Sequence, residues 1–231
     1  MHIIKEQLSR GITKNTKPYK GPPMEGMIAR WYDKNRRSTS DQERLSRKVR
    51  ETLPKGGRVL EVAPGPGYLA IDLAKSGIYQ VVGLDISKTF VEIARAHAED
   101  ESVDVNFRHG NASNMPFDDE SFDFVICVAA FKNFSEPVQA IDEMHRVLKS
   151  GGKALIVDLR KGSSLQEITT HIKHDMGLHG INAFFTKSVF KYFLLKNAYT
   201  KAEMEELVSQ TRFTQCDIRE DTISLEICLT K

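Results

Sequence analysis

The residues that could do chemistry cluster around two glycines that follow a short apolar run. Residues 58–63 form that run, Gly65 and Gly67 follow it, and apolar side chains at helical spacing begin just after Tyr68;. The sequence therefore predicts a buried strand, a glycine turn and a helix in succession. Because glycine has no Cβ, a ligand could approach the N–H groups and the positive dipole end of the new helix. This arrangement is typical of loops that bind an adenosine cofactor.

The glycine spacing alone does not name the cofactor. It also satisfies the fingerprint of dinucleotide-binding proteins, with Asp85 about 20 residues further on;. Glu61 favours a different ligand, because a carboxylate near the end of a buried strand is costly without a partner, and a cationic ligand group would supply one. The pyrophosphate of a dinucleotide is negatively charged, so it would not supply a partner for this carboxylate. Residues 61–67, Glu-Val-Ala-Pro-Gly-Pro-Gly, resemble the first motif of the class I S-adenosylmethionine-dependent methyltransferases.

This resemblance implies roles for further residues. In the family, the acid of the first strand lies near the methionine end of the cofactor, and Ala63 stands where the first glycine is usual. Asp85 matches the acid that binds the ribose diol, and Asn111-Ala112 stands where an aspartate-alanine pair recognises adenine. Tyr32 resembles the helix tyrosine of the ubiquinone and menaquinone biosynthesis type, a candidate contact of the methionine carboxylate, or else it anchors the N-terminal arm. The candidate cofactor-binding residues are therefore Tyr32, Glu61, Ala63, Gly65, Gly67, Asp85, Ile86, Asn111, Ala112 and Val128.

Methyl transfer from a sulfonium requires mainly the positioning of two reactants. A general base is needed only if the accepting atom must lose a proton. Candidate bases are Asp158, His171 and His174, with Asp175 beside them. The two histidines also have the i, i+3 spacing that metal ligands on one helix can share. No further ligand stands at a familiar spacing, so we expect no metal.

The rest of the pattern alternates strands with helices. Strands are predicted at residues 58–63, 80–86, 103–108, 124–130, 153–159, 213–219 and 223–230;. Such alternation predicts an α/β fold, Rossmann-like and doubly wound, with a mostly parallel seven-stranded sheet. The last two segments read as a hairpin, which matches the antiparallel last strand of the resembling family. Ser40, Ser87 and Thr200 are predicted to cap helices.

The 231 residues suit one α/β domain with a modest appendage;. We expect a basic arm with lid helices at residues 1–57 and an S-adenosylmethionine-binding domain at residues 58–231, with a substrate-side insertion at residues 161–198. Residues 1–58 hold 15 Lys and Arg against 6 Asp and Glu. This excess could contact nucleic acid or an acidic substrate, although a solvated helix face is the commoner meaning.

The favoured hypothesis is an S-adenosylmethionine-dependent methyltransferase that methylates a small-molecule acceptor by in-line displacement and releases S-adenosylhomocysteine. One alternative is RNA or protein methylation, suggested by the basic first quarter. Another is a non-catalytic S-adenosylmethionine-binding partner subunit, suggested by Ala63 and Asn111. No stretch approaches the roughly 20 apolar residues of a membrane span, and the first residues lack a secretory signal pattern;. We therefore expect a cytoplasmic monomer or homodimer.

Overall fold

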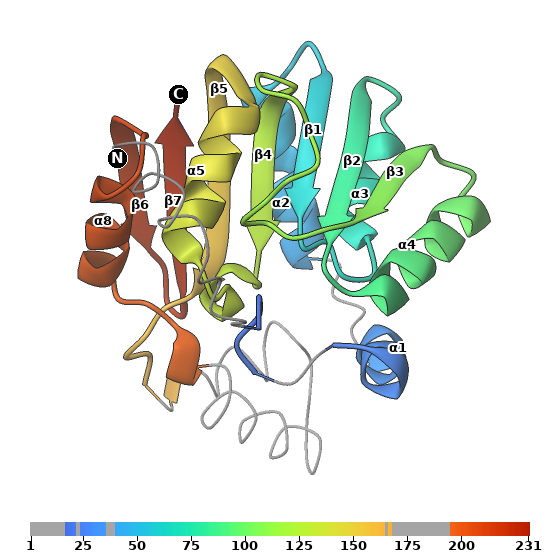
Figure 1. Ribbon diagram of the computed structural model, residues 1–231. Coiled ribbons are helices and arrows are strands. Elements are labelled where there is room, and N and C mark those ends of the chain that lie inside the picture. The colour runs from blue at the N-terminus through green and yellow to red at the C-terminus, as the bar shows by residue number, and fades with distance from the viewer. Residues whose placement is uncertain (1–16, 22–23, 36–39, 165, 168–194) are drawn as a thin grey trace, which may run out of the picture.

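The computed structural model describes residues 17–21, 24–35, 40–164, 166–167 and 195–231. Within these residues, seven strands form one sheet in the order β3-β2-β1-β4-β5-β7-β6 (Figure 1). The strands are β1 (Gly57–Val62), β2 (Tyr79–Asp85), β3 (Val105–His109), β4 (Phe122–Val128), β5 (Leu148–Leu159), β6 (Gln215–Glu220) and β7 (Ser224–Thr230). β7 pairs antiparallel with β5 and β6, and the other pairs are parallel. The predicted Rossmann-like, doubly wound α/β fold is confirmed.

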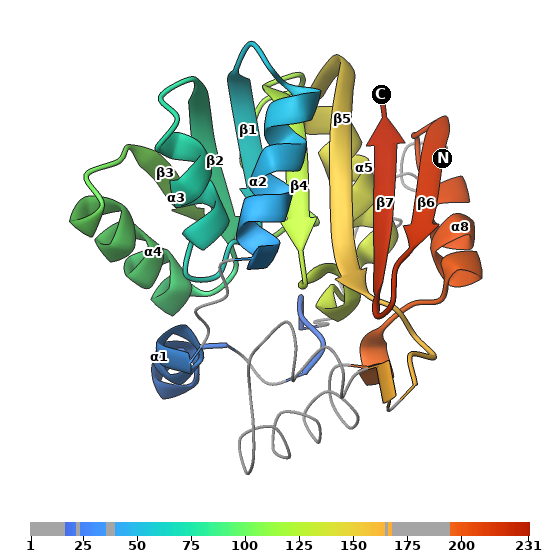
Figure 2. The ribbon, with the colours of Figure 1, turned by 180° about the vertical axis from the view of Figure 1, so that it is seen from behind.

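Helices cover both faces of the sheet. Figure 1 shows α5 and α8 in front of it, and Figure 2, seen from behind, shows α2, α3 and α4 on the other face. α1 lies below the carboxyl ends of the parallel strands instead (Figure 1). The helices are α1 (Gly26–Asn35), α2 (Ser40–Thr52), α3 (Tyr68–Ala74), α4 (Lys88–Asp100), α5 (Pro137–Val147) and α8 (Lys201–Ser209), with the 3-10 helices η1 (Phe131–Asn133) and η3 (Leu195–Asn197). The strand order reverses between β1 and β4, where ligands of open α/β sheets bind;.

Apolar side chains alternate between two cores, one on each face of the central strands. On β1, Leu60 and Val62 pack into the core on the side of α5 and α8, whereas Val59 packs into the core with α2, α3 and α4. Burial on both faces is expected of a central parallel strand. Because strand side chains alternate with period two, Glu61 shares the face of Val59, toward α3;. A carboxylate is thereby placed among apolar neighbours.

Most strand boundaries differ from the predicted ones by one or two residues, and the end of β4 and the start of β5 have physical causes. β4 ends at Val128, not at residue 130, because Ala129 has a left-handed φ of 57°, which an extended strand cannot contain;. β5 begins at Leu148, not at residue 153, because Leu148 pairs with the first residue of β4 before the register shifts. The turn at the end of β4 therefore begins earlier than the apolar pattern indicated.

Two of the three predicted helix caps are confirmed. The Ser87 hydroxyl oxygen accepts a hydrogen bond from the Phe90 N–H over 3.0 Å at the start of α4. Thr200 and Glu203 form a reciprocal capping box at the start of α8, with distances of 3.1 and 2.8 Å;. α2 begins at Ser40 itself, and the side chain of this residue lies outside the part of the chain that the structure describes.

Candidate functional site

The glycine loop joins β1 to α3 at the carboxyl edge of the sheet. Gly65 and Gly67 have φ angles of 55° and 83°, a left-handed conformation that favours glycine;. A Cβ on Gly67 would lie 2.6 Å from the ring of Phe107, whereas a Cβ on Gly65 would meet nothing within 4 Å. Gly67 is therefore required by packing, and Gly65 leaves open space in which a ligand could contact the loop.

Glu61 is the buried acid of the first strand. The residue is only 4% exposed, and its Oε2 atom has no hydrogen-bond partner. Burial and, to a smaller extent, the Asp85 charge raise the pKa of this carboxyl to about 8, although a hydrogen bond from the Ala70 N–H lowers it in part;. An unpartnered carboxylate oxygen beside the glycine loop fits a cationic ligand group.

Asp85 ends β2 and faces the same loop. Its Oδ2 accepts a hydrogen bond from the Gly65 N–H over 2.9 Å, and its Oδ1 accepts one from the Ser87 N–H over 2.8 Å. Burial raises the pKa of Asp85 to about 6 despite these two bonds. The carboxylate thus fixes the glycine loop against β2, and each of its oxygens keeps a further lone pair for a ligand hydroxyl. Ile86 follows it, and its carbonyl oxygen lies 3.1 Å from His109 Nε2.

Ala63 adopts a left-handed conformation with a φ of 57°. A residue with a Cβ in this region costs roughly 1–2 kcal/mol relative to the right-handed one, a cost that glycine does not have. The loop therefore carries backbone strain at Ala63, where the resembling family usually has a glycine.

The predicted adenine loop follows β3. Asn111 forms an isolated bridge with Asn114, and its Oδ1 accepts a hydrogen bond from the Ser113 N–H over 3.0 Å. The Ser113 hydroxyl donates to the carbonyl oxygen of Glu136 over 3.3 Å. Ala112 is half-buried against the core under α5. The side chain of Asn111 therefore shapes its own turn, and its amide NH2 group is left to meet a ligand.

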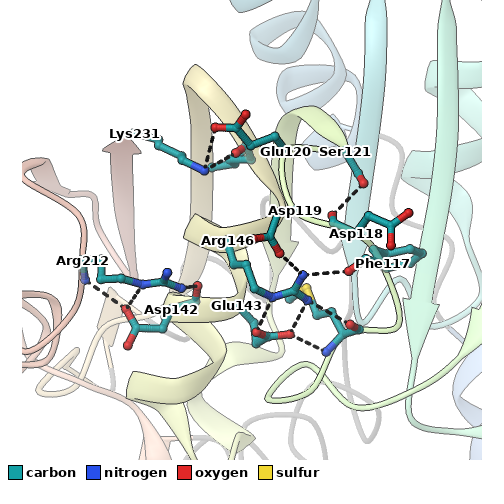
Figure 3. A network of polar contacts seen from close by, with 12 residues as sticks. Phe117, Asp118, Asp119, Glu120, Ser121, Asp142, Glu143, Arg146, Arg212 and Lys231 are labelled. Carbon is teal, nitrogen blue, oxygen red and sulfur yellow. Dashed lines mark hydrogen bonds and ion pairs between the residues drawn. The ribbon is translucent and has the colours of Figure 1, made fainter.

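Arg146 on α5 fixes the rest of this loop (Figure 3). Its guanidinium donates to the Met115 and Phe117 carbonyl oxygens over 3.0 and 2.8 Å and to Asp119 over 2.8 Å. It also forms a bidentate pair with Glu143, with distances of 2.7 and 2.8 Å;. Glu143 in turn accepts a hydrogen bond from the Met115 N–H over 2.7 Å. Both backbone groups of Met115 are thus bound to α5.

Two N-terminal segments lie over the carboxyl edge. On α1, Tyr32 packs edge-on against Phe90 of α4, with ring centroids 5.7 Å apart. The short segment that contains Tyr19 bridges to Phe134, after η1. Burial and the charge of Asp85 raise the pKa of Tyr19 to about 12, so its phenol stays protonated. The Tyr32 ring therefore packs against α4, and Tyr19 adds a buried phenol near the site.

The far side of the site is formed by the turn after β4. Val128 is half-buried, and Lys132 and Asp158 form a fully buried ion pair with an Nζ–Oδ1 distance of 2.7 Å. The Lys132 ammonium also donates to the Ala129 carbonyl oxygen over 2.5 Å, and the Lys132 N–H donates to Asp158 Oδ2 over 2.8 Å. Asp158, a candidate base, is therefore the partner of a lysine. Its use as a base would require this ion pair to break.

The structure brings most of the predicted cofactor residues to one edge of the sheet. Asp175 and the other candidate bases, His171 and His174, lie outside the described residues. Within the described residues, no three His, Cys, Asp or Glu side chains are grouped to hold a metal ion. None of the described helices is both long and apolar enough to cross a bilayer.

Sequence reasoning missed several residues at the site. Lys132 could have been noticed as a lone lysine within an apolar segment that follows a buried strand. Nothing in the local pattern distinguishes Tyr19 or Arg146, because their partners are distant in sequence.

The residues present fit S-adenosylmethionine. Its sulfonium and ammonium groups match the unpartnered oxygen of Glu61, and its ribose hydroxyls match the carboxylate of Asp85;. The open space at Gly65 allows close approach of the ligand to the loop backbone. A dinucleotide pyrophosphate would instead bring negative charge toward two buried acidic groups, so the donor set favours the methionine cofactor.

Comparisons with known proteins agree with this geometry. Residues 60–156 match the methyltransferase domain family. The chain is 35% identical over 143 residues to the demethylmenaquinone methyltransferase of Chlorobaculum tepidum. The aligned segment covers 61% of this chain and 57% of that protein. The chain is 37% identical over 102 residues to the uncharacterized methyltransferase YcgJ of Bacillus subtilis, which covers 44% and 40%. The chain thus spans about half of the length of these relatives.

Solved structures share the fold. A SAM-dependent methyltransferase from Aquifex aeolicus superposes with a TM-score of 0.61 at 17% identity, covering 83% of this chain and 97% of that one. The plantazolicin methyltransferase BpumL, in complex with a monoazolic desmethylPZN analog and SAH, superposes with a TM-score of 0.64 at 15% identity, covering 83% of this chain and 82% of that one. The matched domain, the strand order and the glycine loop of this chain are thus similar to those of the class I S-adenosylmethionine-dependent methyltransferases.

Proposed function

We propose that this protein transfers the methyl group of S-adenosylmethionine to a small-molecule acceptor by in-line displacement. The observation that carries the proposal is the buried Glu61 with an unpartnered Oε2 beside the glycine loop. A cationic cofactor would neutralise this carboxylate, whereas no cation in the described part of the chain is bonded to that oxygen. The S-adenosylhomocysteine product then leaves with one positive charge fewer than the cofactor.

The chain's own residues act mainly by positioning. The bound cofactor supplies a sulfonium methyl group, an electrophile that needs no metal. Asp85 and Gly65 hold the ribose and the loop, and the turn anchored by Arg146 presents Asn111 to the adenine. Lys132 and Asp158 brace the turn after β4, so the backbone that faces the methyl group stays fixed. Orientation of this kind can supply roughly 7–11 kcal/mol of the barrier in favourable cases.

The relatives support a small-molecule acceptor. Among the matched proteins, one is a demethylmenaquinone methyltransferase and another methylates plantazolicin, as their names state. Asp158 is engaged by Lys132, so His171 and His174 stay as the candidate bases if the accepting atom must lose a proton. We still expect a monomer or homodimer. We also expect residues 1–57 to form the arm and residues 58–231 the cofactor domain, although β1 begins one residue before that boundary.

The test is production of S-adenosylhomocysteine. Wild type and Asp85→Asn are incubated with S-adenosylmethionine and a panel of demethylated quinones, phenols, amines and thiols. Turnover that depends on one acceptor and is lost in Asp85→Asn would support the proposal. Cofactor binding without turnover on any acceptor would favour the non-catalytic partner. Salt-sensitive binding to RNA, with methyl incorporation into it, would favour the nucleic-acid alternative.

A further inference from the structure

Three helices meet at one carboxylate on the lid helix α1. Tyr68, the first residue of α3, donates its hydroxyl hydrogen to Oδ1 of Asp33 over 2.5 Å. The Nε2 atom of His97, on α4, lies 3.5 Å from the other oxygen, Oδ2. The rings of Tyr68 and His97 stack, with centroids 5.3 Å apart and an interplanar angle of 18°. The C-terminal end of α1 is therefore bound to both helices that flank the glycine loop.

His97 extends this contact to the loop itself. Its Nδ1 atom lies 3.0 Å from the carbonyl oxygen of Pro66, the residue between the two loop glycines. A carbonyl oxygen can only accept a hydrogen bond, so Nδ1 carries the hydrogen and donates it. The Tyr68 hydroxyl bond to Asp33, the stacked Tyr68 and His97 rings and the His97 bond to Pro66 thus connect α1 to the glycine turn.

The N-terminal end of α1 is bound separately. The Glu25 carboxylate accepts hydrogen bonds from the N–H groups of Lys88 and Thr89, over 2.9 and 3.1 Å, at the N-terminus of α4. An acidic group is favourable at this end of a helix. Tyr32 packs against Phe90 between the two ends. Release of either end would therefore leave α1 attached to α4, but no longer fixed.

We propose that Asp33, Tyr68 and His97 act as a latch that holds α1 and the glycine loop in one arrangement ready for the adenosine cofactor. The proposal rests on the cofactor site described above and names positioning residues for it. Preorganisation adds affinity because less conformational freedom is lost on binding. If the latch opens, the fraction of protein competent to bind falls, and the apparent Kd rises by the same factor.

Tyr68 and Tyr79 provide a test variant and a control variant, and the fluorescence of Trp31 reports on α1. Tyr68→Phe keeps the ring that stacks on His97 and removes only the hydroxyl. Tyr79→Phe is the control, because the Tyr79 hydroxyl donates to the Leu53 carbonyl oxygen over 2.9 Å at the amino end of β2, away from the cofactor edge. The single tryptophan of the chain, Trp31, lies on α1 and is 62% exposed, so its quenching by acrylamide reports on the position of α1.

The experiment measures the Kd of S-adenosylhomocysteine by calorimetry and the quenching constant of Trp31 in the ligand-free protein. Tyr68→Phe should raise the Kd by up to about tenfold, the effect of one lost hydrogen bond to a charged group, and change the quenching constant. Tyr79→Phe should change neither. Asp33→Asn, which keeps an acceptor for Tyr68, should lie between wild type and Asp33→Ala.

Equal Kd and equal quenching in Tyr68→Phe and wild type would overturn the latch. A higher Kd with unchanged quenching would also overturn it, since Tyr68 would then act without moving α1. Wild type that fails to bind S-adenosylhomocysteine would refute the cofactor site instead. Circular dichroism confirms that each variant is folded before these comparisons are made.

Discussion

Glu61 should release a proton when S-adenosylmethionine binds. Burial raises its pKa to about 8 in the ligand-free protein, so at pH 7 about nine tenths of the molecules carry the proton there;. A cationic ligand beside the carboxylate favours the charged form and lowers this pKa. Binding at pH 7 should therefore release about 0.9 proton from Glu61, and about 0.1 from Asp85, whose pKa is about 6;.

The assay is isothermal titration calorimetry at pH 7 in two buffers with different ionisation enthalpies, such as phosphate and Tris. The difference between the two observed enthalpies gives the number of protons released. Glu61→Gln, which cannot ionise, should release about 0.1 proton or fewer. The affinity of wild type should rise with pH up to about 8, because the proton competes with the ligand;.

The sign of the stability effect follows from the same shift. A carboxyl whose folded pKa is raised binds its proton more tightly in the folded state, so it destabilises the ligand-free protein as pH rises from about 4.3 to about 8;. Glu61→Gln should therefore gain stability over wild type across that window. Wild type that releases no proton at pH 7, and whose affinity does not change between pH 6 and 8, would refute this reasoning.

Three further predictions concern the loops. Gly67→Ala should destabilise the fold by about 2–4 kcal/mol in urea titrations, because its Cβ would overlap Phe107 of β3;. Gly65→Ala should cost only about 1–2 kcal/mol of backbone strain, and it should weaken cofactor binding;. Equal stability of the two variants would contradict the packing argument. Ala63→Gly should leave binding intact and stabilise the protein by up to about 1 kcal/mol, because it relieves a left-handed alanine at some cost in chain entropy;. A lower melting temperature of Ala63→Gly than of wild type would contradict strain at this position. Arg146→Met should destabilise the protein by about 2–4 kcal/mol at pH 7. The hydrogen bond from Arg146 holds the pKa of Glu143 below its usual value. The stabilisation by the Arg146–Glu143 pair is therefore present above about pH 5 and lost as pH falls through the acid range. A difference in unfolding free energy between wild type and Arg146→Met that does not depend on pH would contradict this.

The fold was predictable because its local signals agree with one another. The run before Gly65, the glycine turn and the apolar strand that ends at Asp85 each predict part of a doubly wound sheet. Caps at Ser87 and Thr200 depend on residues three positions apart, so sequence alone reveals them. Boundaries were less predictable, since the left-handed φ at Ala129 ends β4 inside an apolar run.

The site was predictable only where a residue lies next to its motif. Glu61 and Asp85 follow from their positions on strands, and the structure adds the burial that changes their pKa values. Arg146 binds backbone groups about 30 residues away in sequence, and Asp33 on α1 accepts from Tyr68 on α3, 35 residues away. Such contacts exist only after the chain has packed, so no local spacing indicates them.

The most direct test of the cofactor assignment is thermal melting with S-adenosylmethionine, S-adenosylhomocysteine and NAD at matched concentrations. A ligand present at 100 times its Kd stabilises the folded state by about 2.7 kcal/mol, which is easily detected. The site described here predicts a rise in melting temperature with both sulfur ligands and none with NAD. A rise with NAD alone, or no rise with either sulfur ligand, would contradict it.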